Sequence, residues 1–384
     1  MTYSSPPLMG VEEEYLVVDP VTRAVAPRAP QVIESAAERL GDRASTEITR
    51  FQVEAKTPPC SGAADLERHL REMRAAGAAA AAGHGLALIA SGTPLLGDAV
   101  PPPITELARY DLGIANYRSL HDEQSICAAH VHVHLPDRDQ AVLVSNHLRP
   151  WLPVLIALMA NSPIWAGRDT GYASWRTLCW GKWPVAGPPP YLSSYAEYEQ
   201  TVAALTETGA LVDPGTIFWD VRPSARLPTL EVRVTDVPAT AEETLLLALV
   251  VRALVMVASR SVEHGDPGPL LASEQLRARY WRAARDGLDG HGIHPFLGDL
   301  RPAGDLIEAL LHHIAPALRV TGDLEEVTGR LERLRAAGTG AARQRGALRY
   351  RGEVSDVVDH LVDRFTARTM EQEPDPVPSG GTHP

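Results

Sequence analysis

Four separated segments of the chain carry polar side chains at every second position beside apolar neighbours, and this period of two constrains the fold most strongly. Successive side chains of a β-strand point to opposite faces, so each segment predicts a strand with one apolar and one polar face. The segments are GVEEEYLVVD (10–19), TEITRFQVEAKT (46–57), SICAAHVHVHLP (125–136) and PTLEVRVTDV (228–237). If they share one sheet, its apolar face packs on helices and its polar face forms the floor of a site.

The polar faces of the predicted strands collect acidic, imidazole and arginine side chains. By parity they hold Glu12 with Glu14, Gln52 with Glu54, His130 with His132 and His134, and Glu231 with Arg233. Clustered carboxylates repel one another unless a cation lies among them, and hard oxygen ligands suit Mg²⁺ or Mn²⁺. The polar face therefore predicts a divalent metal site. Because Mg²⁺ bridges carboxylates to nucleotide phosphates, Mg-ATP is the expected ligand.

Each pattern also has a simpler interpretation. A glutamate-rich strand end is usually solvated surface, although repetition over four strands weakens this explanation. The alternating histidines could mark an exposed strand or a zinc site of the HxH type, which needs further ligands and an open position that the sequence does not single out. Arg233 could serve only to pair with acidic neighbours.

The common nucleotide-binding signatures are missing from the sequence. There is no GxxxxGK[ST], since WGKW (180–183) lacks the upstream glycine spacing and the hydroxyl, and no GxGxxG follows a predicted strand. A P-loop or Rossmann enzyme is therefore disfavoured. If ATP binds, we expect it to bind through metal and arginine on a sheet, because lysine occurs only at Lys56 and Lys182.

Charge and cysteine content narrow the choice of partner. The 384 residues include 36 basic and 48 acidic side chains, a net charge of −12, which argues against nucleic acid as a partner. The three cysteines are scattered and form no CxxC pair, so we expect no disulfide framework and a cytoplasmic protein. The apolar run 150–163 contains three prolines and predicts a buried helix, so no membrane is expected.

The order of predicted elements indicates an α+β fold with a mainly antiparallel sheet packed on helices. Helices are expected over 61–83, 104–124 and 141–160, short strands over 86–91 and 216–224, and a long loop with little periodicity from 161 to about 214. From about residue 241 onward the pattern is helical almost to the end, with breaks over 264–272, 287–304, 321–323 and 338–340. We expect one catalytic domain over 1–370 and, because it is rich in Pro, Gly and acids, a disordered tail over 371–384.

Eight motifs in order give the chain a resemblance to a known family. They are GVEEEYLVVD, EAKTPPC, AHVHVH, ANSPIWAGRDTGYASWR, WDVRPS, PTLEVRVTDV, WRAARDGLDG and TGAARQR, and together they resemble the carboxylate-amine ligases of the glutamate-cysteine ligase type 2 family from about residue 8 to about 365. The resemblance implies a helix-rich C-terminal half and a catalytic sheet like that of glutamine synthetase. It also implies Mg²⁺-dependent phosphorylation of the γ-carboxylate of glutamate by ATP, followed by attack of an amine.

The resemblance also implies roles for individual residues. Glu12, Glu14, Glu54 and Glu231 look like metal ligands, and Glu231 and Arg233 look catalytic, Arg233 through contact with phosphate. His130 and His132 resemble groups near the nucleotide phosphates. Arg222 is expected near the nucleotide, Arg176 and Glu54 near the substrate, and Arg343 is expected to close the site from the helical half.

The expected function is ATP-dependent formation of a γ-glutamyl amide between L-glutamate and an amine or amino acid, with Mg²⁺, or alternatively Mn²⁺, as cofactor. No residue singles out cysteine as the acceptor. The alternatives are a phosphotransferase using the same metal-ATP site without ligation, a catalytically silent binding protein, and a zinc hydrolase. By resemblance alone, a homodimer is expected.

Overall fold

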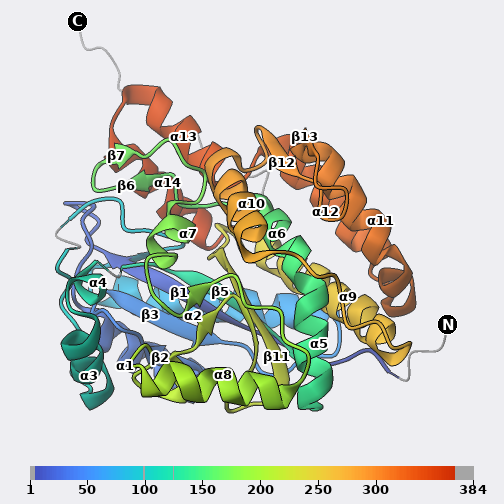
Figure 1. Ribbon diagram of the computed structural model, residues 1–384. Helices are drawn as coiled ribbons and strands as arrows, with labels where there is room; N and C mark the ends of the chain where they lie inside the picture. The colour runs from blue at the N-terminus through green and yellow to red at the C-terminus, as the bar shows by residue number, and fades with distance from the viewer. Residues whose placement is uncertain (1–4, 98–99, 124, 368–384) are drawn as a thin grey trace, which may run out of the picture.

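A seven-stranded sheet lies at the centre of the computed structural model, which describes residues 5–97, 100–123 and 125–367 (Figure 1). Six strands follow the order β10-β11-β5-β1-β3-β2, and β4 also pairs with β1. Every pairing between these strands is antiparallel, which confirms the predicted α+β class. The bounds are β1 Met9–Val18, β2 Ala44–Thr46, β3 Gln52–Lys56, β4 Ala87–Ile89, β5 Ala128–His134, β10 Val221–Pro223 and β11 Thr229–Asp236. The tail predicted to be disordered lies outside the described residues.

The strand register places the predicted polar side chains beside one another. Glu12 of β1 lies opposite His130 of β5 on one side and Lys56 of β3 on the other, and Glu14 lies opposite Glu54. Glu231 of β11 lies opposite His132. Because paired residues on neighbouring strands project to the same face, these four strands form one continuous polar floor.

Helices from distant parts of the chain pack on the apolar face of the sheet. Among them are α2 (Ala63–Gly83), α9 (Ala241–Glu263) and α14 (Val354–Phe365). Phe365 meets Tyr15 of β1 edge to face, with ring centroids 4.8 Å apart. Helix α9 begins with a capping box in which the Thr240 hydroxyl and the Glu243 carboxylate satisfy each other's backbone amides. The main core is therefore built between the sheet and these helices.

Glu13 points into this apolar layer. Its side chain is fully buried and accepts hydrogen bonds from the Arg74 guanidinium, with Nε 3.1 Å from Oε2, and from the hydroxyls of Tyr15 and Thr244. Arg74 also donates to the carbonyls of Pro238 and Ala239. The middle carboxylate of the three at 12–14 is therefore compensated by an arginine below the sheet and does not belong to the polar floor.

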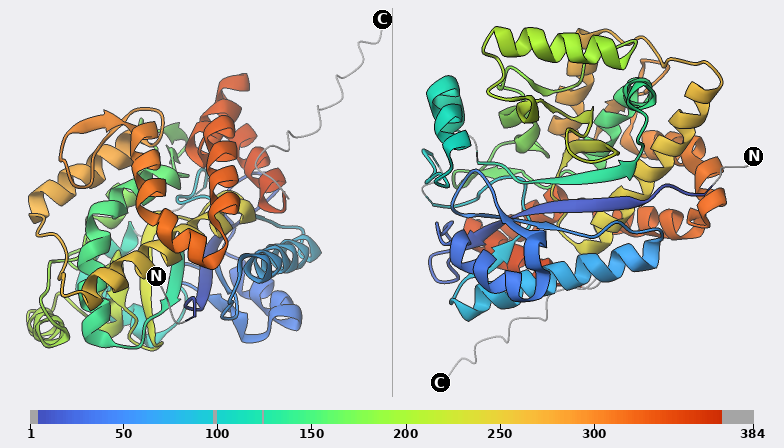
Figure 2. Two further views of the ribbon diagram at one scale, coloured as in Figure 1. Left: turned by 90° about the vertical axis from the view of Figure 1, so that its right-hand side faces the viewer. Right: turned by 90° about the horizontal axis from the view of Figure 1, so that it is seen from below.

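Several other helices also contact the sheet: α1 packs on β2 and β3, α5 on β10, and α6 on β11. Figure 2 shows α3 and α8 on one side of the sheet, with α1 and α2 on the other. The helices α11 and α12 pack on α9, and α13 packs on α14. Their bounds are α1 Ala29–Leu40, α3 Ala108–Tyr117, α4 Ser119–Asp122, α5 Arg138–Leu148, α6 Leu152–Leu158, α7 Trp175–Trp180, α8 Tyr195–Glu207, α10 Ser273–Asp286, α11 Ala303–Thr321, α12 Leu324–Ala337 and α13 Gly340–Arg351.

Several predicted elements need correction. The strand predicted over 46–57 is a hairpin, because the chain turns between β2 and β3. The loop predicted over 161–214 contains α7, α8 and the short strands β6 (Ile164–Trp165), β7 (Arg168–Asp169) and β8 (Ala186–Gly187); β8 pairs with β9 (Phe218–Trp219). Helix α8 has no buried residue, and its apolar side chains Tyr195, Tyr198, Val202 and Leu205 are only partly buried. The hairpin of β12 (His291–Ile293) with β13 (Leu300–Pro302) needs no such correction, because it lies within the break in the helical pattern predicted over 287–304.

Two helical runs among the described residues are long and apolar enough to cross a bilayer. They are 138–158, which joins α5 to α6, and α9. The most apolar windows of the two runs are 89% and 72% buried inside the protein, respectively. Such burial is typical of core helices. It agrees with the prediction that the apolar run 150–163 forms a buried helix.

Candidate active site

A cavity of about 650 Å³ lies over the polar floor of the sheet. Nine of the ten side chains predicted from the sequence line it: Glu12, Glu14, Glu54, His130, His132, Arg176, Arg222, Glu231 and Arg233. They come from five strands and from α7, so positions more than 200 residues apart in the chain share one chamber. Six of the nine are buried, and Glu12, Arg222 and Arg233 are partly buried, which sets this cluster apart from a solvated acidic surface.

Arg343 is the predicted site residue that does not line the cavity. It lies on α13, where Nη2 is 2.6 Å from Oε1 of Glu243 and Nη1 donates to the carbonyl of Gly338. The carboxylate at the start of α9 thus holds this arginine in the helical layer. The expectation that Arg343 closes the site is corrected.

One group of three carboxylates is bonded to no arginine within the described part of the chain. Oxygen atoms of Glu14, Glu47 and Glu54 all lie within 4.8 Å of one another. Burial, and next the charges of Glu47 and Glu54, raises the pKa of Glu14 well above its usual value. Burial, and next the charge of Glu54, raises the pKa of Glu47 to about 7. A bound cation would relieve the repulsion between these three carboxylates.

Glu47 was not identified from the sequence. It follows β2 in the turn of the hairpin, inside the segment that was predicted to be one straight strand. The Ser45 hydroxyl, also on this hairpin, donates to Glu54 over 2.8 Å. The only signal in the sequence would have been a turn after Thr46, because such a turn brings Glu47 beside Glu54.

The second group of carboxylates is held by cations. The Glu231 carboxylate accepts one hydrogen bond from Nε of Arg222, over 3.0 Å, and another from Nη1 of Arg233. Although burial opposes it, the charges of Arg233 and Arg222 lower the pKa of Glu231, so it stays ionised. Lys56 Nζ lies 2.7 Å from Glu54 and 3.7 Å from Glu12, at the border between the two groups.

The two buried histidines stand between these groups. His130 Nδ1 lies 3.3 Å from Oε2 of Glu12, and burial followed by the charge of Arg233 lowers its pKa to about 4. His130 is therefore neutral at pH 7. His132 Nδ1 contacts the Thr229 hydroxyl at 2.9 Å, while its buried Nε2 has no hydrogen-bond partner. His134, at the end of β5, is exposed and does not line the cavity.

The donor set fits divalent metal ions. Besides the Glu14 group, ligand atoms of Glu12, Glu54 and His130, and of Glu12, His132 and Glu231, lie within 4.8 Å of one another. In the last of these sets, Nε2 of His132 lies 3.7 Å from Oε1 of Glu12 and makes no hydrogen bond to the described residues, so this atom is free to bind an ion. Carboxylates that outnumber imidazoles favour Mg²⁺ or Mn²⁺ over zinc.

An aromatic wall faces the charged floor across the cavity. Its members are Tyr117, Trp180, Trp183 and Phe218, with Trp183 4.4 Å from Tyr117 and 5.7 Å from Phe218 between ring centroids. Trp180 and Trp183 belong to the segment predicted to be a long loop, and none of the four residues was identified from the sequence. One face of the chamber thus suits charged groups and the other an apolar or planar group.

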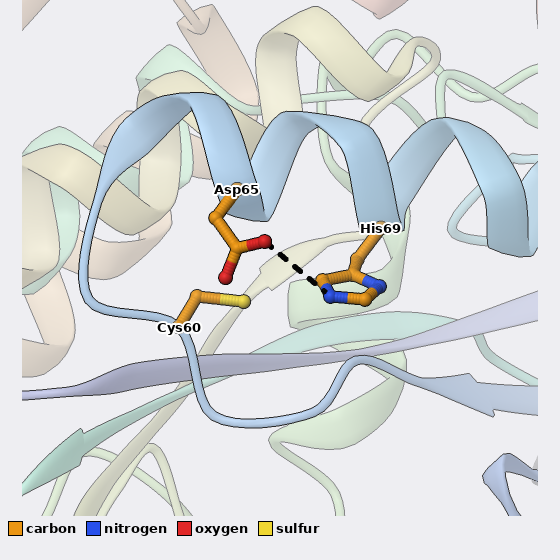
Figure 3. Close-up of side chains that lie close together, drawn as sticks. All are labelled: Cys60, Asp65 and His69. Carbon is orange, nitrogen blue, oxygen red and sulfur yellow. Dashed lines mark ion pairs between the residues drawn. The ribbon is translucent and has the colours of Figure 1, made fainter.

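A separate cluster, Cys60, Asp65 and His69, also brings three potential ligands together, at the start of α2 (Figure 3). Figure 3 shows the His69 ring directed at Asp65, a contact of 3.6 Å. Arg68 Nη2 donates to Asp65 and lies 2.9 Å from Nε2 of His69. The Arg68 guanidinium therefore already supplies a positive charge next to Asp65 and His69. Burial, and next the charge of Asp65, raises the pKa of the Cys60 thiol to about 11.

Comparisons with known proteins agree on the family. The model of the glutamate-cysteine ligase family 2 (GCS2) matches residues 8–360. A Mycobacterium sp. (strain KMS) protein provisionally designated glutamate–cysteine ligase 2-2 is 46% identical over 370 residues, which are 94% of this chain and 99% of that protein. A Nocardia farcinica protein provisionally designated glutamate–cysteine ligase 2-1 is 44% identical and covers 98% of this chain and 97% of its own length.

Two solved structures share the fold. The glutamate–cysteine ligase of Francisella tularensis, solved in complex with AMP, aligns with a TM-score of 0.64 at 12% identity over 96% of this chain and 90% of its own. A bifunctional glutathione synthetase from Pasteurella multocida aligns with a TM-score of 0.69 at 16% identity over 94% of this chain. This chain spans about half of that protein, 52% of its length. At such identities the likeness concerns the fold.

Proposed function

The chain belongs to the glutamate-cysteine ligase family 2, and from that premise we propose that it is an ATP-dependent carboxylate-amine ligase that forms a γ-glutamyl amide. One observation carries the proposal. Buried carboxylates in numbers that need divalent cations lie beside two arginines that converge on the same chamber. Such a site can hold a nucleoside triphosphate and the carboxylate of a substrate together. Activation of a carboxylate by phosphoryl transfer requires this arrangement.

The proposed reaction has two steps. A γ-carboxylate oxygen of glutamate attacks the γ-phosphorus of ATP, which forms an acyl phosphate and releases ADP. The nitrogen of the amine then attacks the acyl carbon, the C–O bond to phosphate breaks, and phosphate and a proton leave. Bound Mg²⁺ would supply charge neutralisation at the phosphates. The residues that would hold it are Glu12, Glu14, Glu47, Glu54 and Glu231, with His130 and His132 beside them.

The arginines of the floor would act on phosphate oxygens. Arg233 lines the cavity and is partly buried, and its Nε makes no hydrogen bond to the described residues, so this N–H remains available to a ligand. Arg222 is held by Glu231 and by the carbonyls of Gly215 and Ile217, which fixes its orientation. Positioned cations of this kind stabilise the negative charge that accumulates when a phosphoryl group is transferred to a carboxylate.

The chain needs no protein nucleophile for this chemistry. The three cysteines, Cys60, Cys127 and Cys179, are buried, and burial raises the pKa of each thiol above its usual value. Thiols kept protonated are poor nucleophiles. Direct attack by the substrate amine is the simpler route.

A mass-spectrometric screen tests the proposal. Purified protein is incubated with glutamate, ATP, Mg²⁺ and a panel of amino acids and amines, and γ-glutamyl products and ADP are measured together. We expect ADP formation that depends on one class of amine and matches the amide formed. Sustained ADP formation without any amine would instead identify a phosphotransferase. If neither ADP nor an amide forms, the remaining interpretation is a binding protein without catalytic activity. A parallel metal analysis that found bound zinc would favour the hydrolase alternative.

A further inference from the structure

Strand β11 carries Glu231 and Arg233, and it is interrupted by a β-bulge at that point. Glu231 and Val232 pair in register with His132 and Val131, but Thr235 already pairs with Ala129. Two residues, Arg233 and Val234, therefore lie opposite the single residue His130. A bulge redirects the side chains around it and breaks the regular ladder, so the backbone there needs other hydrogen-bond partners.

Arg176 supplies these partners. Its Nη2 donates to the carbonyl of Arg233 over 3.1 Å and its Nη1 donates to the carbonyl of Val234 over 3.2 Å. The amide of Arg233 donates to the carbonyl of Asp220 over 2.7 Å from the other side. Arg176 is 2% exposed, and both ends of its guanidinium fork are directed at the backbone of β11. A fork used in this way is not free to grip a substrate carboxylate end-on.

A buried hydrogen-bond network fixes Arg176 in turn. The Ser162 hydroxyl accepts from the Arg176 amide at 3.1 Å and donates to Asp236, which also accepts from the Ser174 hydroxyl at 2.7 Å. Asp236 accepts a third bond from the amide of Asn161. The network thus ties the segment 161–176 to the end of β11, three residues beyond Arg233.

The network continues into the helical half through the motif TGAARQR. Gln344 of α13 donates to the side-chain and backbone oxygens of Asn161, at 2.8 and 3.0 Å. A side chain at Gly340 would overlap the amide group of Asn161, so α13 approaches as closely as a glycine allows. The motif therefore acts on the site through Gln344 and Gly340, while its Arg343 pairs with Glu243.

We propose that Arg176 is a positioning residue, which holds the β11 bulge so that Glu231 and Arg233 enter the cavity together, and that it is not a ligand of the substrate carboxylate. This inference rests on the proposed function for its catalytic consequence, since Glu231 and Arg233 are the groups placed at the metal and phosphates. Its geometric consequence is independent of turnover: loosening the bulge displaces Glu231 from His132 and Glu12, with which it forms a metal-ligand set.

The test compares R176M with R149M. Arg149 is a matched control: it is 1% exposed, donates to the carbonyls of Pro189 and Leu271 at 3.0 Å each, and does not line the cavity. Mn²⁺ affinity, measured by electron paramagnetic resonance without substrates, is the decisive readout. We expect R176M to bind Mn²⁺ about 10-fold more weakly than R149M and R176K to recover part of that loss, because a positioned ligand set depends on its supporting bonds.

Mn²⁺ binding by R176M equal to that of R149M would overturn the inference. If R176M is too unstable to purify, S174A removes one hydroxyl of the same network; about 3-fold weaker binding supports the inference, and unchanged binding refutes it. Where ligation is measurable, R176M should lower kcat about 100-fold with the KM for glutamate within about threefold. Absence of ligation in the unaltered protein would refute the proposed function and leave the Mn²⁺ comparison intact.

Discussion

Metal binding at the Glu14, Glu47 and Glu54 group should strengthen as pH rises. The pKa of Glu47 is about 7, because burial and Glu54 favour its protonated form. Without a cation, Glu47 is therefore protonated in about 90% of molecules at pH 6 and about 10% at pH 8. A carboxyl group must lose its proton to bind a metal. From Glu47 alone, Mn²⁺ affinity should rise about 10-fold over this range, which is about 1.4 kcal/mol.

The assay is a Mn²⁺ titration at pH 6 and pH 8, followed by electron paramagnetic resonance. The E47Q variant should bind more weakly at pH 8 and show a smaller gain in affinity between the two pH values. Part of the gain should remain, because the pKa of Glu14 is also raised. Glu308 is a matched control, since its side chain is 70% exposed on α11, and E308Q should behave like the unaltered protein. An undiminished pH dependence in E47Q would refute the reasoning.

Three further changes test other parts of the structure. E231Q removes the carboxylate between Arg222 and Arg233 and should lower the rate of ATP-dependent ligation at least about 100-fold while the fold is retained. ADP release measures the rate, and circular dichroism checks the fold. Turnover like that of the unaltered protein would contradict the metal site. R233K keeps the charge but loses the planar fork and should lower kcat/KM at least about 10-fold, so an unchanged value would assign Arg233 a structural role. R74M leaves Glu13 buried without its cation and should lower the free energy of unfolding by about 3–5 kcal/mol in urea titration, whereas a change below about 1 kcal/mol would contradict the pairing.

The polar floor could be predicted because a strand's side-chain period is independent of its surroundings. Parity alone placed Glu12 with Glu14 and left Glu13 on the other face, and the register shows both placements. The same rule grouped Glu231 with Arg233, although Arg233 is itself part of a bulge. For these residues the local geometry of an extended chain was sufficient information.

Features that depend on turns or on long-range packing were not predictable in this way. Glu47 joins the carboxylates only because the chain reverses between β2 and β3. Arg343 belongs to a motif that does reach the site region, but which of its side chains reaches inward depends on how α13 packs: Gln344 contacts Asn161 and Arg343 meets Glu243. Helical periodicity cannot tell which neighbour each face will meet.

The sequence by itself determined the strand faces, the antiparallel α+β class and the family, since these follow from local periodicity and from motifs whose order along the chain can be compared directly. Only the tertiary structure decided how each charge is balanced: Glu13 by Arg74 beneath the sheet, Glu231 by two arginines above it, and the Glu14 group, among the described residues, by Lys56 and no arginine. The reason is physical. The pKa of a carboxyl group depends on burial and on charges a few ångströms away, and those neighbours come from distant parts of the chain.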